Sequence, residues 1–218
     1  MVGCEEEQIG QTSPEQRAKG VVQRLPVSTP EQRRTELVEG LRRGEPGAAG
    51  ELFDLYAPRI NRRVWRILGA DPEHDDVVQQ VFAQLFASVG KLRSPEALVS
   101  WIDMVTVNTV RKELRRRGRR RLYALPTDLP EPAAAATQET SYVFTRALAV
   151  LGRMKPDDRI VFVLRFVEQA ELAEIAVACG LSLATVKRRI ARAKQAFTKK
   201  VARDPVLAEY AKGLSLGR

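Results

Sequence analysis

Seven basic side chains lie between Lys187 and Lys200, and this stretch contains no acidic residue. The apolar residues in and around it recur at helical spacing, which predicts a helix with one buried stripe and a cationic outer face. That stripe comprises Val186, Ile190, Ala193, Phe197 and Val201. Lysine and arginine on such a face can neutralise DNA phosphates, and arginine can also donate two hydrogen bonds to guanine in the major groove.

A shorter helix and a tight turn are predicted directly before this basic helix. Leu172, Ile175 and Ala176 form one helical face, Gly180 can take the positive φ that ends a helix, and Ser182 can cap the next one. A basic helix alone is often only a solvated surface, but together these signals predict a DNA-binding helix-turn-helix. Its candidate DNA-contacting residues are Thr185, Lys187, Arg188, Arg189 and Arg192. We expect Arg188 and Arg192 to face outward toward bases.

A second basic block, from Arg111 to Arg121, holds eight basic residues and one acid, Glu113. Such a block is typical of a phosphate-binding track, although it can also be a solvated helix end. Residues of this block, and others in the helix and loop before it, are candidates for capturing a single DNA strand. They are Lys91, Arg93, Asn108, Arg111, Lys112, Arg115 and Arg116. Trp101 could stack on a base, but its spacing with apolar neighbours favours a place in the core.

Four consecutive residues, Glu73 to Asp76, are of types that bind metal ions in nucleases. Consecutive helical positions diverge by about 100°, so these side chains do not converge easily on one ion. They are better explained as acids that complement a helix N-terminus and face a protein partner. Two isolated cysteines and one histidine do not make a zinc site, so neither an enzyme activity nor a metal or other cofactor is expected.

The chain has 218 residues, a formal net charge of +9 and a pI of about 9.9, which favours a polyanionic partner. No apolar run approaches the ~20 residues of a membrane span, so membrane insertion is not expected. The N-terminus carries acids where a signal peptide has cations and an apolar block. A cytoplasmic location is therefore expected.

Helical spacing recurs throughout the chain without strand alternation, which predicts an all-α fold of two small domains on a flexible linker. Helix starts are expected at Thr29, Asp71 and Ser94, each followed by proline and an acid, and Pro58 is expected to kink or break a helix. The expected parts are a partly disordered extension (1–46), a first domain (47–121), a proline-containing linker (122–140), a second domain (141–201) and a weakly ordered tail (202–218).

Read together, DPEHDDVVQQVFAQLF, SWIDMVTVNTVRKELRRRGRRR and DDRIVFVLRFVEQAELAEIAVACGLSLATVKRRIARA resemble the extracytoplasmic-function (group IV) sigma factors of bacterial RNA polymerase. These are minimal two-domain members of the sigma-70 family, and the resemblance runs from about Gly47 to Val201. It implies promoter-specific initiation, with the first domain (region 2) reading the −10 element and the helix-turn-helix (region 4) reading the −35 element.

The resemblance also implies partners: core polymerase, through the β′ clamp helices and the β subunit, promoter DNA, and an anti-sigma protein. Residues that resemble the clamp-binding surface are Asp75, Asp76, Gln79 and Gln80. The chain departs from the family where Gln80 replaces a frequent Glu and where Gln169–Ala170 lacks a common glycine. The alternative is a helix-turn-helix repressor or activator that does not bind the polymerase core.

Overall fold

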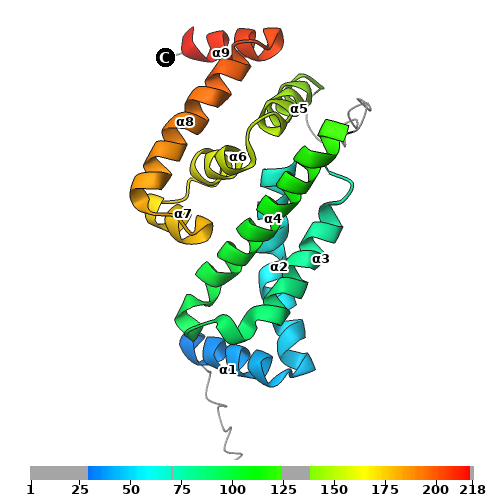
Figure 1. Cartoon of the computed structure of the whole chain (residues 1–218), viewed down its shortest axis with the longest axis vertical. Coiled ribbons are helices and arrows are strands. Elements are labelled where there is room, and N and C mark those ends of the chain that lie inside the picture. The colour runs from blue at the N-terminus through cyan, green and yellow to red at the C-terminus, as the bar shows by residue number, and fades with distance from the viewer. Residues whose placement is uncertain (1–28, 70, 124–137, 217–218) are drawn as a thin grey trace, which may run out of the picture.

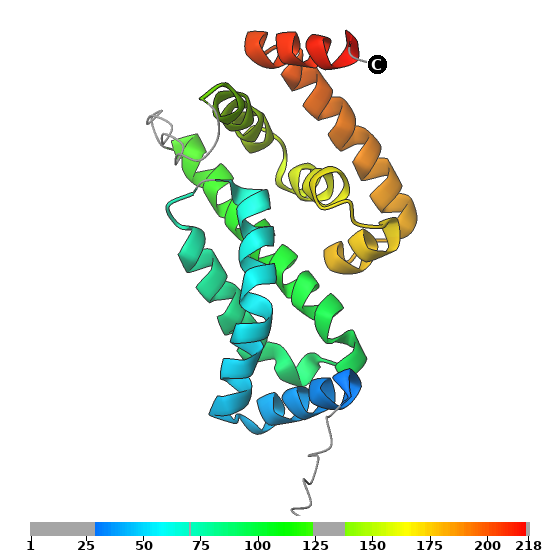
Figure 2. The ribbon, with the colours of Figure 1, turned by 180° about the vertical axis from the view of Figure 1, so that it is seen from behind.

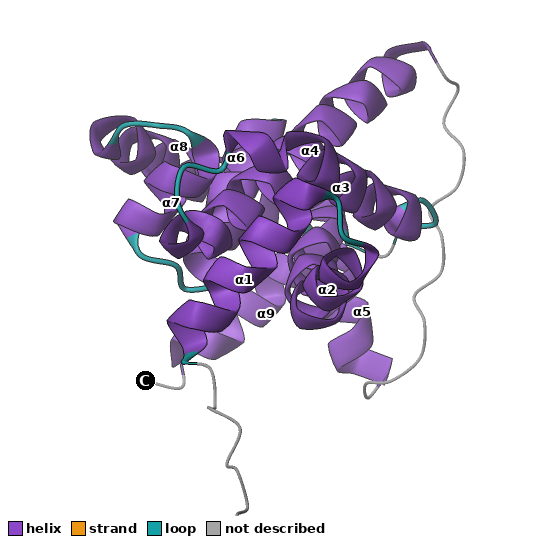
Figure 3. Cartoon of the chain, turned by 90° about the horizontal axis from the view of Figure 1, so that it is seen from below, coloured by secondary structure: helices purple, strands orange, loops and turns teal. Residues whose placement is uncertain are grey.

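The computed structural model describes residues 29–69, 71–123 and 138–216, and all regular structure in these ranges is helical. Two helical bundles follow one another along the chain and lie side by side (Figure 1). The same arrangement is seen from behind in Figure 2, and Figure 3 shows both bundles built from helices and short loops. The predicted all-α fold with two helical units is confirmed.

The first bundle contains four α-helices and two short 3-10 helices. They are α1 (Pro30–Arg43), α2 (Pro46–Leu68), α3 (His74–Ser88), η2 (Val89–Lys91), η3 (Pro95–Ala97) and α4 (Leu98–Tyr123). The second bundle contains five α-helices and one π-helical turn. They are α5 (Gln138–Gly152), α6 (Pro156–Phe162), η4 (Val163–Val167), α7 (Leu172–Cys179), α8 (Leu183–Val201) and α9 (Pro205–Leu216).

Capping residues set several of these helix ends, as their sequence positions predict. Thr29 and Gln32 form a reciprocal capping box at the start of α1, and Gly44 ends that helix with φ of 72°. Gly180 ends α7 with φ of 65°, and the hydroxyl of Ser182 accepts a hydrogen bond from the backbone of Thr185 at 3.3 Å. The turn between the two helices of the helix-turn-helix is thus held by its own backbone and cap.

The core of the first bundle lies between α2, α3 and α4 and is mostly aliphatic, with α1 closing one end. Trp101 is 7% exposed and belongs to this core, which confirms its structural interpretation. α2 continues past Pro58 as one helix, so the expected break is absent. Burial of Ile60 and Val64 just beyond the proline outweighs the single backbone hydrogen bond that proline removes.

The centre of the second bundle is formed by α6 and α8, with Ile160 and Val161 fully buried. Phe166 and Val167, in contrast, are 42% and 44% exposed, although their apolar side chains would favour burial. The chain changes to a π-helical turn there, with the amide of Glu168 bonded to the carbonyl of Val163 at 3.0 Å, and the wider turn carries both side chains outward.

Three expectations concern the segments outside the bundle cores. The extension forms α1 from Pro30 onward, whereas its residues 1–28 lie outside the described part. Most of the expected linker, residues 124–137, also lies outside it. In the expected tail, Pro205–Leu216 form α9, and Asp204 before it pairs with Arg146 of α5 at 2.8 Å.

The two bundles are in direct contact, which the sequence does not predict. α4 packs on both α6 and α7, and α2 touches η4. In the same C-terminal half of α2, Trp65 stacks on Phe144 of α5 with ring centroids 5.8 Å apart. The contact brings the basic part of α4 against the bundle that carries the helix-turn-helix.

Candidate nucleic-acid interface

The outer face of α8 carries the residues predicted to contact duplex DNA. Lys187 and Arg188 are exposed, and neither makes an ion pair with another residue that the structure describes. Thr185 is half-buried, and its hydroxyl lies 2.9 Å from that of Ser182 at the helix cap. These three side chains occupy the first turns of the helix, which is where a major-groove reader meets base edges.

The other two candidates on α8 are held by carboxylates at the start of α6. Arg189 Nη1 lies 3.2 Å from Asp157 Oδ2, and Arg192 Nη2 lies 2.5 Å from Asp158 Oδ1. Asp158 is 3% exposed and binds Arg192 through both Nε and Nη2. The two arginines therefore also join α8 to α6 within the second bundle.

Lys91, the last residue of η2, and Arg93, in the loop between η2 and η3, are both exposed. Leu92 between them is buried, and its carbonyl accepts a hydrogen bond of 2.6 Å from Nη2 of Arg42. Since α1 packs on both short helices, it fixes the backbone from which these two cations project. Sequence reasoning did not assign α1 any part in this site.

The basic block of α4 is engaged by carboxylates wherever its arginines are described. Arg111 Nε and Arg115 Nη2 lie 3.0 and 3.1 Å from the carboxylate of Asp157. Arg116 binds Glu113 and Glu73 at 2.7 and 2.8 Å. Lys112 is exposed, whereas Asn108 is half-buried. The basic block predicted from the sequence therefore lies on α4, but its described arginines form ion pairs with carboxylates.

The structure does not bring all seven candidate strand-capturing residues together. Lys91 and Arg93 lie before the first turn of α4, while Arg115 and Arg116 lie in its last third. The intervening helix places the two groups roughly 25 Å apart, at about 1.5 Å per residue. Only Asn108, Arg111, Lys112, Arg115 and Arg116 form a local cluster.

The first half of α3 presents a polar surface that fits a protein partner. Its four candidate residues are all exposed: Asp75, Asp76, Gln79 and Gln80. Three of them, all except Asp75, line a shallow hollow of about 450 Å³ together with Glu73 and Arg116. We call these four residues the α3 ridge.

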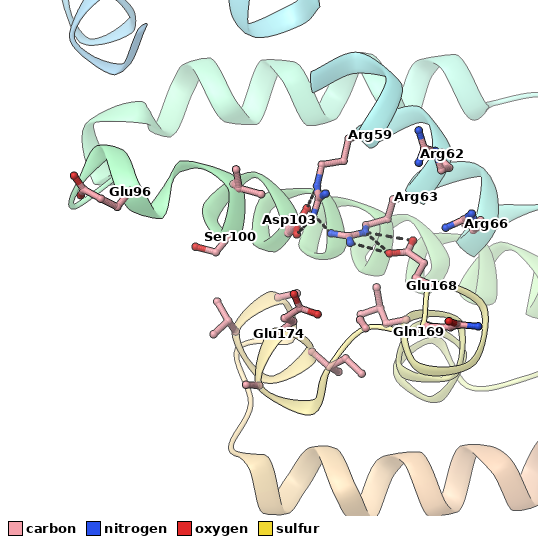
Figure 4. A pocket seen from close by; sticks show the side chains of 17 residues that line it. Arg59, Arg62, Arg63, Arg66, Glu96, Ser100, Asp103, Glu168, Gln169 and Glu174 are labelled. Carbon is pink, nitrogen blue, oxygen red and sulfur yellow. Dashed lines mark hydrogen bonds and ion pairs between the residues drawn. The ribbon is translucent and has the colours of Figure 1, made fainter. Parts of the chain in front are cut away.

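A larger cleft, of about 690 Å³, lies between the bundles and is lined by α2, α4, η4 and α7 (Figure 4). On its wall, Arg63 of α2 binds Asp103 of α4 at 2.5 Å and Glu168 at 2.8 Å. Arg59 adds two further hydrogen bonds to Asp103. Sequence reasoning missed this cluster, because no local pattern relates pairs of residues that lie 44 and 105 positions apart.

Burial and ion pairing act in opposite directions on the acids of these clusters. Burial raises the pKa of Asp103, but the guanidinium groups of Arg59 and Arg63 outweigh it and hold the pKa below its ordinary value. The pKa of Asp157 is likewise lowered: burial opposes the shift, and Arg189, Arg115 and Arg111 overcome it. Both carboxylates therefore stay charged at neutral pH.

Cys179 at the end of α7 is a buried small residue, and burial raises the pKa of its thiol. Glu73 and His74 face neighbouring side chains: Glu73 binds Arg116, and His74 Nε2 lies 3.1 Å from Asn61 Oδ1. Within the described ranges, no three His, Cys, Asp or Glu side chains are placed to hold a metal ion. None of the described helices is long and apolar enough to cross a bilayer.

Comparison with known families matches both bundles. Residues 52–120 match the model of sigma-70 region 2, and residues 145–197 match that of sigma-70 region 4. The first match begins within α2, so α1 lies outside both.

Individual proteins and solved structures agree with these matches. The chain is 33% identical over 150 residues to the ECF RNA polymerase sigma factor SigE of Mycolicibacterium smegmatis, covering 66% of this chain and 58% of that protein. It is 27% identical to the ECF RNA polymerase sigma-E factor of Escherichia coli, covering 76% and 92%.

Among solved structures, CnrH in complex with the cytosolic domain of CnrY has a TM-score of 0.54 at 21% identity, covering 78% of this chain and 98% of that one. The sigma factor RpoE of Bartonella quintana, in complex with the anti-sigma factor NepR, also has a TM-score of 0.54, at 19% identity, covering 71% and 97%. These two show the same fold. With regions 2 and 4 in order and these relatives, the chain belongs to the sigma-70 family of RNA polymerase sigma factors, in its extracytoplasmic-function group.

Proposed function

We propose that this sigma factor directs promoter-specific initiation by docking on core RNA polymerase through the α3 ridge. The observation that carries the proposal is that the side chains of this ridge are exposed and have no side-chain partners among the described residues. Its four side chains are exposed and make no hydrogen bond or ion pair with any other described residue, whereas the arginines of α4 beside it are paired. A polar ridge without internal partners, on a rigid helix, fits a protein surface.

The partner that the family implies for this ridge is the pair of β′ clamp helices, with further contacts to the β subunit. Two acids and two amides supply acceptors and donors for a polar helical surface. Gln80 carries no charge where relatives often have Glu, so the electrostatic share of docking falls on Asp75 and Asp76.

Promoter recognition is divided between the bundles in this proposal. Lys91 and Arg93 contact the −10 element from the loop that α1 supports, and the arginine cluster of α4 tracks the displaced strand. Lys187 and Arg188, with Thr185, read the −35 element from the exposed start of α8. Arg189 and Arg192 contribute to this face while bracing α8 against α6.

An anti-sigma protein is a further partner in this proposal. The two solved structures compared above are complexes, one with the anti-sigma factor NepR and one with the cytosolic domain of CnrY. A repressor that acts away from polymerase would explain the helix-turn-helix but would leave the region 2 match without a role.

Binding to core polymerase tests the docking surface directly. The double variant Gln79→Ala/Gln80→Ala is expected to bind core at least about tenfold more weakly, because it removes two central polar contacts. Gln84→Ala, on the same helix and also exposed but outside the ridge, is the matched control and should bind normally. Equal binding by wild type and double variant would move the docking surface elsewhere.

A further inference from the structure

We propose that Asp158 is a positioning residue for reading the −35 element: it holds the guanidinium group of Arg192 in the orientation in which that group meets a guanine. The inference rests on the proposed function, because it concerns the DNA-facing side of α8. It assigns a part in sequence specificity to an acid that is itself too buried to touch DNA.

Asp158 binds Arg192 through two nitrogens of one guanidinium group. Arg192 Nε lies 3.1 Å from each carboxylate oxygen, and Arg192 Nη2 lies 2.5 Å from Asp158 Oδ1. Two parallel bonds of this kind fix the plane of a guanidinium group as well as its position. Because Asp158 engages Nε and Nη2, the donors of Nη1 remain available to an acceptor on DNA.

The carboxylate is itself fixed by the helix that carries it. Asp158 lies in the first turn of α6, and its backbone amide donates to the carbonyl of Lys155 at 3.0 Å. The positive end of the helix dipole favours a negative charge at this place. The first turn of α6 is therefore a rigid support for a side chain of α8.

The two partners differ in their exposure. The side chain of Asp158 is 4% exposed, whereas that of Arg192 is 54% exposed. The pair is not needed merely to join the helices, because α6 and α8 also share an apolar contact in which the rings of Phe162 and Phe197 lie 4.4 Å apart. A buried acid that braces an exposed cation instead suits a cation with a function at the surface.

The pairing favours base reading by Arg192 over phosphate binding. Its charge is balanced by Asp158, so its attraction to a phosphate is weaker than that of Lys187 or Arg188, which form no ion pair with another described residue. Base reading depends instead on donors that point in a fixed direction, and arginine can donate two hydrogen bonds to O6 and N7 of guanine.

Fixing the side chain before DNA arrives increases discrimination between base pairs. A free arginine loses rotamer freedom when it binds a base, whereas a braced arginine has lost much of that freedom on folding. A braced arginine also adapts poorly to the wrong base pair, where its donors are left without acceptors. We therefore expect Asp158 to affect the ratio of affinities for different sequences more than the affinity itself.

The test measures base preference at each position of the upstream element. Holoenzyme made from core RNA polymerase and the full-length chain is bound to promoter duplexes with a randomised upstream element, and the bound DNA is sequenced. Arg192→Ala is expected to lower the preference at the base pair that it reads by about tenfold. Asp158→Asn, which places an amide donor where one acceptor oxygen stood, is expected to lower it about threefold at the same base pair.

Two further readouts separate positioning from a general structural role. On a duplex of unrelated sequence, holoenzyme with Asp158→Asn is expected to bind at least as tightly as wild type, because a negative charge beside α8 has been removed. A damaged fold would weaken binding to every sequence. In the background of Arg192→Ala, Asp158→Asn should have no further effect on preference, because the side chain that it positions is absent.

Glu174→Gln is the matched control. It removes the same charge from the helix-turn-helix, but Glu174 is exposed on α7, where its carboxylate accepts a hydrogen bond from the backbone of Glu171. Glutamine can keep that capping-box bond. The control should therefore keep the wild-type preference at every base pair, which separates the position of Arg192 from a gain of positive charge.

Arg192→Lys tests the same point without changing the buried acid, and it decides the question if Asp158→Asn does not fold. Lysine keeps the charge but lacks the planar fork that can bind a carboxylate and a base together. It should lose the same preference as Arg192→Ala. Full preference in Arg192→Ala, Arg192→Lys or a folded Asp158→Asn overturns the inference, and so does a loss in Asp158→Asn at other base pairs.

These outcomes are distinct from a failure of the proposed function. If wild-type holoenzyme prefers a defined upstream sequence and the variants at Asp158 and Arg192 keep that preference, only the positioning role is lost. If wild-type holoenzyme shows no upstream preference at all, the assignment of α8 to the −35 element is contradicted as well.

Discussion

Arg63 of α2 and Glu168 in the turn before α7 form an ion pair of 2.8 Å that joins the two bundles across 105 positions of sequence. Asp103 of α4 binds the same guanidinium at 2.5 Å, so one arginine holds a carboxylate from each bundle. Charged side chains that are this buried are stable only when they pair with opposite charges. Removing one partner therefore leaves the remaining buried charges uncompensated.

Replacing Arg63 by alanine is therefore expected to destabilise the chain by about 3 kcal/mol, because it leaves two partly buried carboxylates without their shared cation. Urea unfolding followed by circular dichroism measures this loss. Arg62→Ala is the control: Arg62 is exposed on the same helix, and a change within about 0.5 kcal/mol is expected. Similar losses in the two variants would show that the ion pair contributes nothing measurable.

Acid should weaken the contact between the bundles. The folded-state pKa of Asp103 is lowered, since Arg59 and Arg63 outweigh the effect of burial, and that of Asp157 is lowered by its three arginines. A carboxylate whose pKa is lower in the folded state than in the unfolded state stabilises the fold. This contribution is fully present above the unfolded-state pKa of about 3.9 and is lost as the pH falls through the lower folded-state pKa.

We therefore expect the urea midpoint to fall steeply below about pH 4 and to change little from these groups between pH 5 and pH 8. Asp103→Asn, which cannot titrate, should show a shallower acid decline than wild type. If the two proteins lose stability in parallel over that range, the charge on Asp103 is not what stabilises the contact.

Gln169 occupies a backbone conformation that favours glycine, with φ of 56°. Gln169→Gly is expected to stabilise the folded chain by up to about 1 kcal/mol, through relief of left-handed strain. Gly180→Ala, at φ of 65°, should do the reverse by about the same amount. A lowered melting temperature in Gln169→Gly would contradict this reading of the turn.

Two substitutions on α8 separate base reading from phosphate binding. Arg188→Ala is expected to relax preference at the −35 element, because Arg188 is exposed near the start of the recognition helix. Lys199→Ala, near the end of the helix, should weaken binding about equally on all sequences and reduce the salt dependence. Binding titrations on DNA with altered −35 sequences, at several salt concentrations, measure the sequence preference and the salt dependence. Indistinguishable behaviour of the two protein variants would contradict the assignment of base reading to Arg188 and phosphate binding to Lys199.

Local sequence chemistry was sufficient for several helix ends and for the helix-turn-helix, although α3 begins at His74 rather than at Asp71. The caps at Thr29 and Ser182 and the glycines at 44 and 180 act through neighbours within a few residues, which a sequence displays directly. The exposed α3 ridge was also predictable, because its acids and amides lie opposite a buried stripe.

The contact between the bundles was not predictable in the same way. Sequence analysis assigned no role to Asp157, and it interpreted the arginines of α4 as a phosphate-binding track or a solvated helix end. Their pairing depends on how two bundles dock, and docking is decided by side chains such as Arg63 and Glu168 that no local pattern connects. The hydrogen bond from Arg42 that supports the segment Lys91–Arg93 joins residues 50 positions apart, so no local pattern predicts it either.

Transcription in vitro with core RNA polymerase on genomic DNA, with start sites mapped, tests the central claim most directly. The account predicts that adding this chain produces starts at a defined set of promoters, and that the Gln79→Ala/Gln80→Ala variant loses them while Gln84→Ala keeps them. Failure of the wild-type chain to bind core, or transcription that starts at the same sites without it, would contradict the account.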